Sequence, residues 1–148
     1  WNHRTNLSHW IMLKDNHLTG TSVTEAVAVA RSLWPGRTVH VECETLDQVR
    51  ESLEAGADAL LLDNMTPESI TACVAAVRDH AERHGRRPLV EASGGITLDR
   101  AVAYAATGVD CLSTSALTSG VGMLDLGLDL DTDLDRGPEG SPEPGGAR

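Results

Sequence analysis

Short apolar runs alternate with longer amphipathic segments along this chain, and that alternation constrains the fold more than any other feature. The runs have the length of buried strands, and the segments between them carry apolar residues at helical spacing. Strands linked in this way by helices and short connections lie parallel, with right-handed crossovers. The expected strands are 10–13, 39–41, 59–62, 89–90 and 111–112, and the expected helices are 22–33, 46–54, 67–83 and 98–106.

Residues at the expected helix ends support these boundaries. Thr45, Thr66 and Thr97 each precede an expected helix, where a hydroxyl oxygen can accept a hydrogen bond from the first turn. Gly56 and Gly108 each follow a helix, at the position where the backbone often turns left-handed. Both ends of the helical segments therefore agree with the periodicity.

Two parallel architectures fit this order of elements, an open doubly wound sheet and a closed barrel. No GxGxxG motif follows the first strand, so the dinucleotide-binding form of the open sheet has no support. Five strands are too few for an eight-stranded barrel. Either the barrel is smaller or its first strands are missing from this chain. The chain opens at Trp1 without an initiator Met, and we expect it to be a piece of a longer protein.

Composition and charge exclude several classes of partner. Only 3% of the residues are aromatic and none is Phe, so the core must be built from Ala, Val, Leu and Ile. The net charge of -10 argues against nucleic acid or an acidic membrane surface as partner. Cys43, Cys73 and Cys111 lie far apart with no CxxC pair, which suggests neither a cysteine zinc site nor a disulfide framework. No signal peptide or membrane-spanning run is evident, so we expect a cytoplasmic protein.

The last part of the sequence differs in kind from the rest. Residues 123–130 alternate apolar and acidic side chains, which is typical of a half-exposed final strand. Residues 131–148 are acidic and rich in Pro and Gly, and a segment with so little apolar surface cannot offset the entropy of ordering. We therefore predict one domain over residues 1–130 and a disordered tail over residues 131–148.

Polar residues follow the expected strands at their carboxyl ends, where β/α folds build their sites. Lys14, Glu42 and Asp63 follow three strands, and Glu91 with 93–95 follows a fourth. Taken singly, Lys14 could be an ordinary surface lysine, and Glu42 and Asp63 could cap the helices that follow them. Together the two carboxylates suit a shared Mg²⁺ that also binds phosphates. The sum predicts an enzyme that handles a phosphorylated metabolite with a divalent metal.

The Ser-Gly-Gly segment at 93–95 lies between a strand and a helix. Glycines at that position let backbone N–H groups approach and cradle a phosphate, and the alternative is a tight turn. His3 and Arg4 are uninformative from spacing alone.

Five ordered blocks of this sequence resemble the quinolinate phosphoribosyltransferases, also called nicotinate-nucleotide pyrophosphorylases. They are NHRTNLSHWIMLKDNH, VHVECETLDQ, LLLDNM, EASGGIT and GVDCLSTSALTSGVGMLDLGLDL, and the match runs to about residue 130. The resemblance implies an α/β fold: an incomplete, TIM-like parallel β/α barrel with fewer than eight strands. This chain would lack the first strands and the amino-terminal sandwich domain.

The resemblance also implies an activity. The family transfers a phosphoribosyl group from phosphoribosyl pyrophosphate to quinolinate with decarboxylation, giving nicotinate mononucleotide for NAD synthesis. It implies Mg²⁺ as cofactor and a homodimer or a multiple of dimers, and the 148-residue chain is expected to be inactive alone. Two alternatives stay open: a same-fold paralogue of the molybdenum-transport-associated kind with another acceptor, and a non-catalytic phosphate-binding remnant.

The matching positions carry roles over from the family. The dicarboxylate acceptor would be bound by His3 and Arg4. Lys14 would contact substrate anions, and Glu42 and Asp63 would hold the ribose hydroxyls and, through Mg²⁺, the pyrophosphate; these three are the expected catalytic residues. The donor's 5′-phosphate would be bound by backbone amides of two segments: Ser93, Gly94 and Gly95, and Thr114, Ser115 and Ala116.

Three departures from the family pattern stand out. His9 replaces an Asp, Ser115 replaces a Gly, and Ser119 replaces a His. A Cβ at Ser115 would crowd the phosphate loop unless the backbone there tolerates a side chain. The family's basic segment, which bears on the choice of acceptor, lies upstream of the block that begins this chain.

Overall fold

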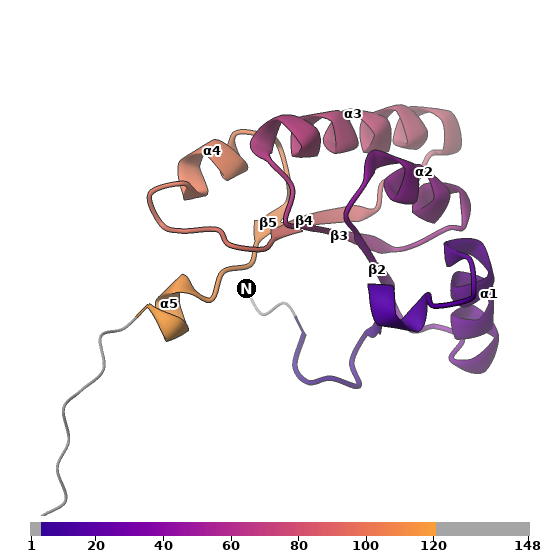
Figure 1. Cartoon of the computed structure of the whole chain (residues 1–148). Helices are drawn as coiled ribbons and strands as arrows, with labels where there is room; N and C mark the ends of the chain where they lie inside the picture. Colours follow the sequence, from indigo (N-terminus) through magenta and orange to yellow (C-terminus); the bar gives the residue numbers. More distant parts are fainter. Residues whose placement is uncertain (1–3, 121–148) are drawn as a thin grey trace, which may run out of the picture.

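Five parallel strands form a single sheet in the computed structural model of this chain, which describes residues 4–120 (Figure 1). Their order in the sheet is their order in the sequence, which is the arrangement that right-handed crossovers give. The strands are β1 (Ile11–Leu13), β2 (Val39–Cys43), β3 (Ala59–Asp63), β4 (Leu89–Ser93) and β5 (Cys111–Leu112). His3, the expected strand at 123–130 and the expected tail at 131–148 lie outside the described residues.

Four helices connect the strands and pack on one face of the sheet (Figure 1). Each of the first four follows the strand of the same number, and a short fifth helix follows β5. The helices are α1 (Val23–Leu33), α2 (Leu46–Glu54), α3 (Pro67–His84), α4 (Ala101–Ala105) and α5 (Ala116–Ser119), and a 3-10 turn, η1 (Asp15–His17), follows β1. The predicted alternation of strand and helix is confirmed. Among the described residues no helix is both long and apolar enough to cross a membrane.

Hydroxyl caps fix two of the three predicted helix starts. The Thr45 side chain accepts from the Gln48 N–H at 3.2 Å, and the Thr66 side chain accepts from the Ser69 N–H at 3.3 Å. The prediction for Thr97 is wrong, because α4 begins only at Ala101. Residues 98–100 form a turn instead, in which the Arg100 N–H donates to the Thr97 carbonyl at 3.1 Å.

Side chains alternate between the two faces of the sheet, as they must along extended strands. The face toward the helices is apolar and makes the core, which includes Val41, Leu60, Leu62 and Val90. The intervening residues point to the opposite face, which is strongly polar. We call it the polar face, and its polar side chains are Lys14, His40, Glu42, Asp63, Glu91, Ser93 and Ser113.

Two aspartates hold the register of the sheet at the amino ends of the strands. The Asp58 carboxylate accepts from the Val39 N–H at 2.8 Å, and the Asp110 carboxylate accepts from the Val90 N–H at 2.7 Å. Each aspartate also donates its own N–H to the carbonyl of the same strand residue. The two sites are a structural repeat, built from a Gly-X-Asp segment that leads into β3 and into β5.

Candidate functional site

Lys14 and Glu42 form an ion pair on the polar face. The Lys14 ammonium lies 2.8 Å from a Glu42 carboxylate oxygen, and Glu42 is only 8% exposed. The hydrogen bond with Glu42 raises the pKa of Lys14, and the charges of Glu42, Asp63 and Asp15 raise it further against the effect of burial. The Lys14 N–H donates to the His17 ring at 3.1 Å, which fixes the backbone from which the lysine extends. The site therefore keeps one cation held against a buried carboxylate.

Asp63 is the last residue of β3, the strand next to β2. It lies on the polar face, two residues further toward the carboxyl end of the sheet than the position opposite Glu42. Glu42 lies opposite Leu61 in the sheet, whereas Asp63 lies opposite Ser93. The Asn64 side chain donates to the Asp63 carboxylate at 2.6 Å. Glu42 and Asp63 thus stand on adjacent strands at different depths, and the Asp63 carboxylate is the more accessible of the two.

Gly94 packs directly against Asn64, which follows Asp63. Its φ is 89°, and a Cβ added there would lie 2.4 Å from the Asn64 side-chain oxygen and 2.5 Å from the Asn64 backbone nitrogen. The Asn64 N–H donates to the Ser93 carbonyl at 3.1 Å. Only glycine fits this position, and its contact joins the strand end that carries a carboxylate to the Gly-Gly turn.

A pocket of about 650 Å³ opens at the carboxyl ends of β4 and β5. It brings together the two segments predicted to bind a phosphate, which are far apart in the sequence. Thr114 is fixed there because its hydroxyl donates to the Ile96 carbonyl and accepts from the Ala116 N–H. The lining residues are Ser93, Gly94, Gly95, Leu112, Ser113, Thr114, Ser115, Leu117 and Thr118.

Not all of the predicted phosphate and acceptor residues reach this pocket. Ala116 is absent from its lining, and its N–H is used by the Thr114 hydroxyl. Arg4 is half-buried and is not among the described residues that line the pocket. Ser115 does line it, and its φ of −84° is ordinary for any L-residue. The serine at this family glycine position therefore introduces no backbone strain.

No role was predicted from the sequence for a buried pair on the polar face, His40 and Glu91. Glu91 is 2% exposed, and one of its oxygens lies 3.7 Å from the His40 ring nitrogen while the other accepts from the Ser113 hydroxyl. Trp10 covers His40 edge-on, with the ring centroids 5.7 Å apart. Period-two alternation within β2 and β4 was the signal, because it places His40, Glu42 and Glu91 on one face.

The pocket and the polar face form one continuous strand-end site. Uncharged residues line the pocket, most of them Ser, Thr and Gly, which suits a phosphate bound by backbone N–H groups. A lysine and two carboxylates lie beside it, which suits hydroxyl groups and a cation. Such an arrangement can hold a phosphorylated sugar, with its phosphate in the pocket and its ring over the carboxylates.

Comparison with known proteins places residues 1–129 within the model of the quinolinate phosphoribosyl transferase C-terminal domain. A probable nicotinate-nucleotide pyrophosphorylase (carboxylating) of Methanocaldococcus jannaschii is 35% identical over 86% of this chain and 46% of its own length. One from Bacillus subtilis is 40% identical over 88% of this chain and 43% of its own length. The chain therefore spans under half the length of these curated relatives.

Solved structures agree with the sequence comparison. The nicotinate-nucleotide pyrophosphorylase from Francisella tularensis superposes with a TM-score of 0.71 at 33% identity, covering 84% of this chain and 42% of that one. The predicted partial parallel β/α barrel is confirmed by this match together with the five-stranded sheet.

Proposed function

This chain belongs to the quinolinate phosphoribosyl transferase C-terminal domain family, and from that premise we propose that its protein is a quinolinate phosphoribosyltransferase. The reaction joins quinolinate to phosphoribosyl pyrophosphate, with release of pyrophosphate and carbon dioxide, and gives nicotinate mononucleotide. We further propose that the protein acts in the cytoplasm as a homodimer or a multiple of dimers. Within it, the described residues would form the part that binds the phosphoribosyl donor.

One observation carries this proposal: the pocket at the ends of β4 and β5 and the strand-end carboxylates belong to a single packed unit. The Gly94–Asn64 contact links the pocket to Asp63, and the Lys14–Glu42 pair lies on the next strands of the same face. A phosphoribosyl donor has its 5′-phosphate and its anomeric carbon at opposite sides of one ring. A site for it needs these two chemistries side by side.

The donor would lie with its 5′-phosphate among the hydroxyls of Ser93 and Ser115 and the backbone N–H groups of the segments 93–95 and 114–115. Glu42 and Asp63 would accept hydrogen bonds from the ribose hydroxyls. Positive charge develops at the anomeric carbon as pyrophosphate leaves, and carboxylates that are already oriented stabilise it without reorganisation. Lys14 would orient Glu42 and attract the anionic substrates. The ion pair places the Glu42 carboxylate against Lys14 at the depth where the charge forms.

The carboxylate donors also fit Mg²⁺, a hard cation that prefers oxygen ligands and keeps several waters. One Glu42 oxygen is engaged by Lys14, so direct coordination would fall to Asp63, and Glu42 would act through the ribose. When bound, Mg²⁺ would neutralise charge on the departing pyrophosphate. The Asn64 amide holds the Asp63 carboxylate in place for that role.

Turnover by the protein that carries this chain tests the proposal. Quinolinate, phosphoribosyl pyrophosphate and Mg²⁺ should give nicotinate mononucleotide, detected by chromatography. Glu42→Ala and Asp63→Ala should each lower kcat by about 100-fold, the usual cost of a positioned charge. Glu44→Ala is the matched control, because Glu44 is an exposed carboxylate at the same end of β2.

Absence of product with Mg²⁺ present would overturn the assigned reaction. Turnover with another aromatic acceptor would then indicate the paralogue. Tight binding of phosphoribosyl pyrophosphate with no turnover on any acceptor would indicate a binding remnant. Wild-type kinetics in both alanine variants would leave the two carboxylates with a structural role only.

A further inference from the structure

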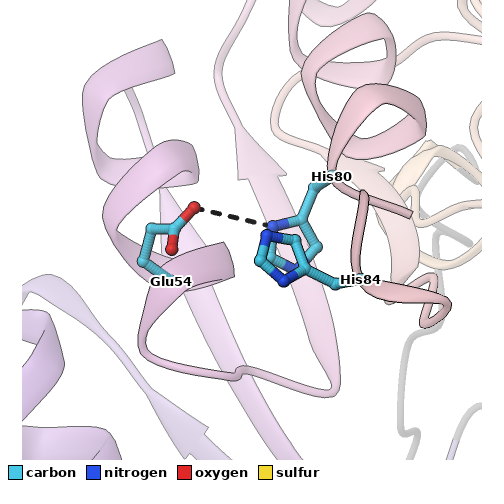
Figure 2. A group of neighbouring side chains, drawn as sticks. All are labelled: Glu54, His80 and His84. Atoms are coloured by element: carbon cyan, nitrogen blue, oxygen red, sulfur yellow. Dashed lines mark ion pairs between the residues drawn. The ribbon is translucent and has the colours of Figure 1, made fainter. Parts of the chain in front are cut away.

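A second cluster of ligating side chains lies on the helical side of the sheet, between α2 and α3 (Figure 2). Glu54 is the last residue of α2, and His80 and His84 lie in the last turns of α3. One potential ligand atom from each of the three lies within 4.8 Å of the others. Among the described residues, these three are the one such group of His, Cys, Asp and Glu.

His80 is the unusual member of the cluster. Its side chain is 7% exposed, and its Nδ1 has no hydrogen-bond partner among the described residues. Figure 2 shows that nitrogen turned toward Glu54, whose carboxylate oxygen is 3.7 Å away. That separation is too long for a hydrogen bond and close to the spacing of two ligands on one tetrahedral metal ion. Buried ring nitrogens are nearly always satisfied, so this one points to a missing partner between the two helices.

Helix geometry brings the second imidazole to the same point. His80 and His84 are four residues apart and lie on one face of α3, one turn apart. Their ring centroids are 4.3 Å apart, with 26° between the planes. Glu54 and His84 are exposed and free to rotate toward an ion, whereas His80 is held by its burial. The cluster thus combines one fixed ligand with two adaptable ones.

The electrostatics of the cluster suit a metal ligand better than a charged histidine. Burial lowers the pKa of His80, and the neighbouring His84 and the cations Arg83 and Arg86 lower it further, against the opposing effect of Glu54. A lowered pKa favours the neutral imidazole, which is the form that coordinates a metal. Glu54 supplies the negative charge that offsets the nearby arginines.

The geometry points to a divalent transition-metal site formed by Glu54, His80 and His84, with Zn²⁺ as the ion that fits it. Two imidazole nitrogens and one carboxylate oxygen are common Zn²⁺ ligands, and water would complete the tetrahedron. This donor set differs from the all-oxygen set proposed for Mg²⁺ at the strand ends, because nitrogen ligands select transition metals.

The site lies near the amino ends of the strands, whereas the pocket lies at their carboxyl ends. Helices α2 and α3 each start beside the carboxyl end of a strand and end near its amino end, so their last turns lie away from the reaction. In β/α barrels that edge serves stability rather than catalysis. The ion would link the end of α2 to the end of α3. Because it would bind the folded domain and not the unfolded chain, it would raise the free energy of unfolding. This inference does not depend on the proposed reaction.

Titration of the chain with Zn²⁺ by calorimetry, and with Co²⁺ by visible absorption, tests the site. His84→Ala and Glu54→Gln remove exposed ligands, so the fold should persist, which circular dichroism checks. His9→Ala and Glu82→Gln are matched controls, because each removes the same group at an exposed position outside the cluster. Each ligand variant should weaken binding by about 100-fold or more, since even outer partners of metal ligands contribute 10- to 100-fold.

Thermal unfolding gives a second, independent readout. Zn²⁺ should raise the Tm of the unaltered chain and of both controls, and should leave the Tm of His84→Ala and Glu54→Gln unchanged. A 10-fold excess of Mg²⁺ should not compete. The site is refuted if the unaltered chain binds no Zn²⁺, or if the two ligand variants bind it as tightly as the controls.

Discussion

Replacement of Gly94 by alanine should be far more damaging than replacement of its neighbour Gly95, although both have positive φ. Gly94 has a φ of 89° and Gly95 a φ of 59°. An added Cβ at Gly95 meets nothing within 4 Å, whereas at Gly94 it overlaps Asn64 at 2.4 to 2.7 Å. Comparison of the two substitutions therefore separates the cost of backbone strain from the cost of a steric collision with Asn64.

The magnitudes follow from these two geometries. A left-handed conformation costs an L-residue about 1–2 kcal/mol, and the stiffer unfolded chain of the alanine variant offsets part of that. We expect Gly95→Ala to lower the free energy of unfolding by about 1 kcal/mol. Gly94→Ala adds the displacement of Asn64, a forced repacking that costs about 1–3 kcal/mol. Its total is about 2–4 kcal/mol, or roughly 4 °C in Tm for each kcal/mol.

Urea unfolding of the single variants and of the Gly94→Ala/Asn64→Gly double variant provides the assay. Asn64→Gly removes the side-chain atoms that the new Cβ meets and tolerates the φ of 55° at that position. Backbone overlap remains in the double variant, so the coupling energy should be favourable but smaller than the full loss. Equal destabilisation by Gly94→Ala and Gly95→Ala would refute the packing of the Gly-Gly turn against Asn64.

Two further predictions concern the scaffold. Asp58→Ala and Asp110→Ala should each lower the free energy of unfolding by about 2 kcal/mol in a urea titration, because each leaves a buried strand N–H without its acceptor; a loss no larger than that of Asp47→Ala, a surface ion-pair residue, would contradict this. Burial raises the pKa of the Cys43 and Cys111 thiols from 9.0 to about 11. The thiolate form is the reactive one, so at pH 8 their alkylation in the folded chain should be about 100-fold slower than in urea. Reaction of either thiol at the unfolded rate would show that the core is open.

The elements of this fold could be predicted because their signals are local. Periodicity and hydroxyl caps located β2, α2 and α3 to within a residue or two, and Gly56 and Gly108 have the predicted left-handed backbone, with φ of 82° and 88°. The predicted start of α4 was wrong. Thr97 offers the same hydroxyl as a true N-cap, but residues 98–100 form a turn before the helix begins. Composition alone does not distinguish these two outcomes.

The site could be predicted only where topology sufficed. Strand order predicts that Lys14, Glu42 and Asp63 gather at one edge, and the structure pairs the first two at 2.8 Å. By contrast, the approach of Glu54 to His80 depends on how α2 packs against α3, and no local pattern encodes that distance. The three cysteines are free, in agreement with their spacing. The proposed Zn²⁺ site uses two histidines and a glutamate, and no cysteine.

Calorimetric titration with phosphoribosyl pyrophosphate tests the central claim most directly, because it asks whether the strand-end carboxylates and the pocket at the ends of β4 and β5 act as one donor site. With Mg²⁺ present, the protein that carries this chain should bind one molecule per site. The affinity should fall by about 10-fold or more when Mg²⁺ is withheld, when Asp63 is replaced by alanine, or when Gly94→Ala disturbs the turn. Absence of binding with Mg²⁺, or an affinity indifferent to both substitutions, would contradict the account.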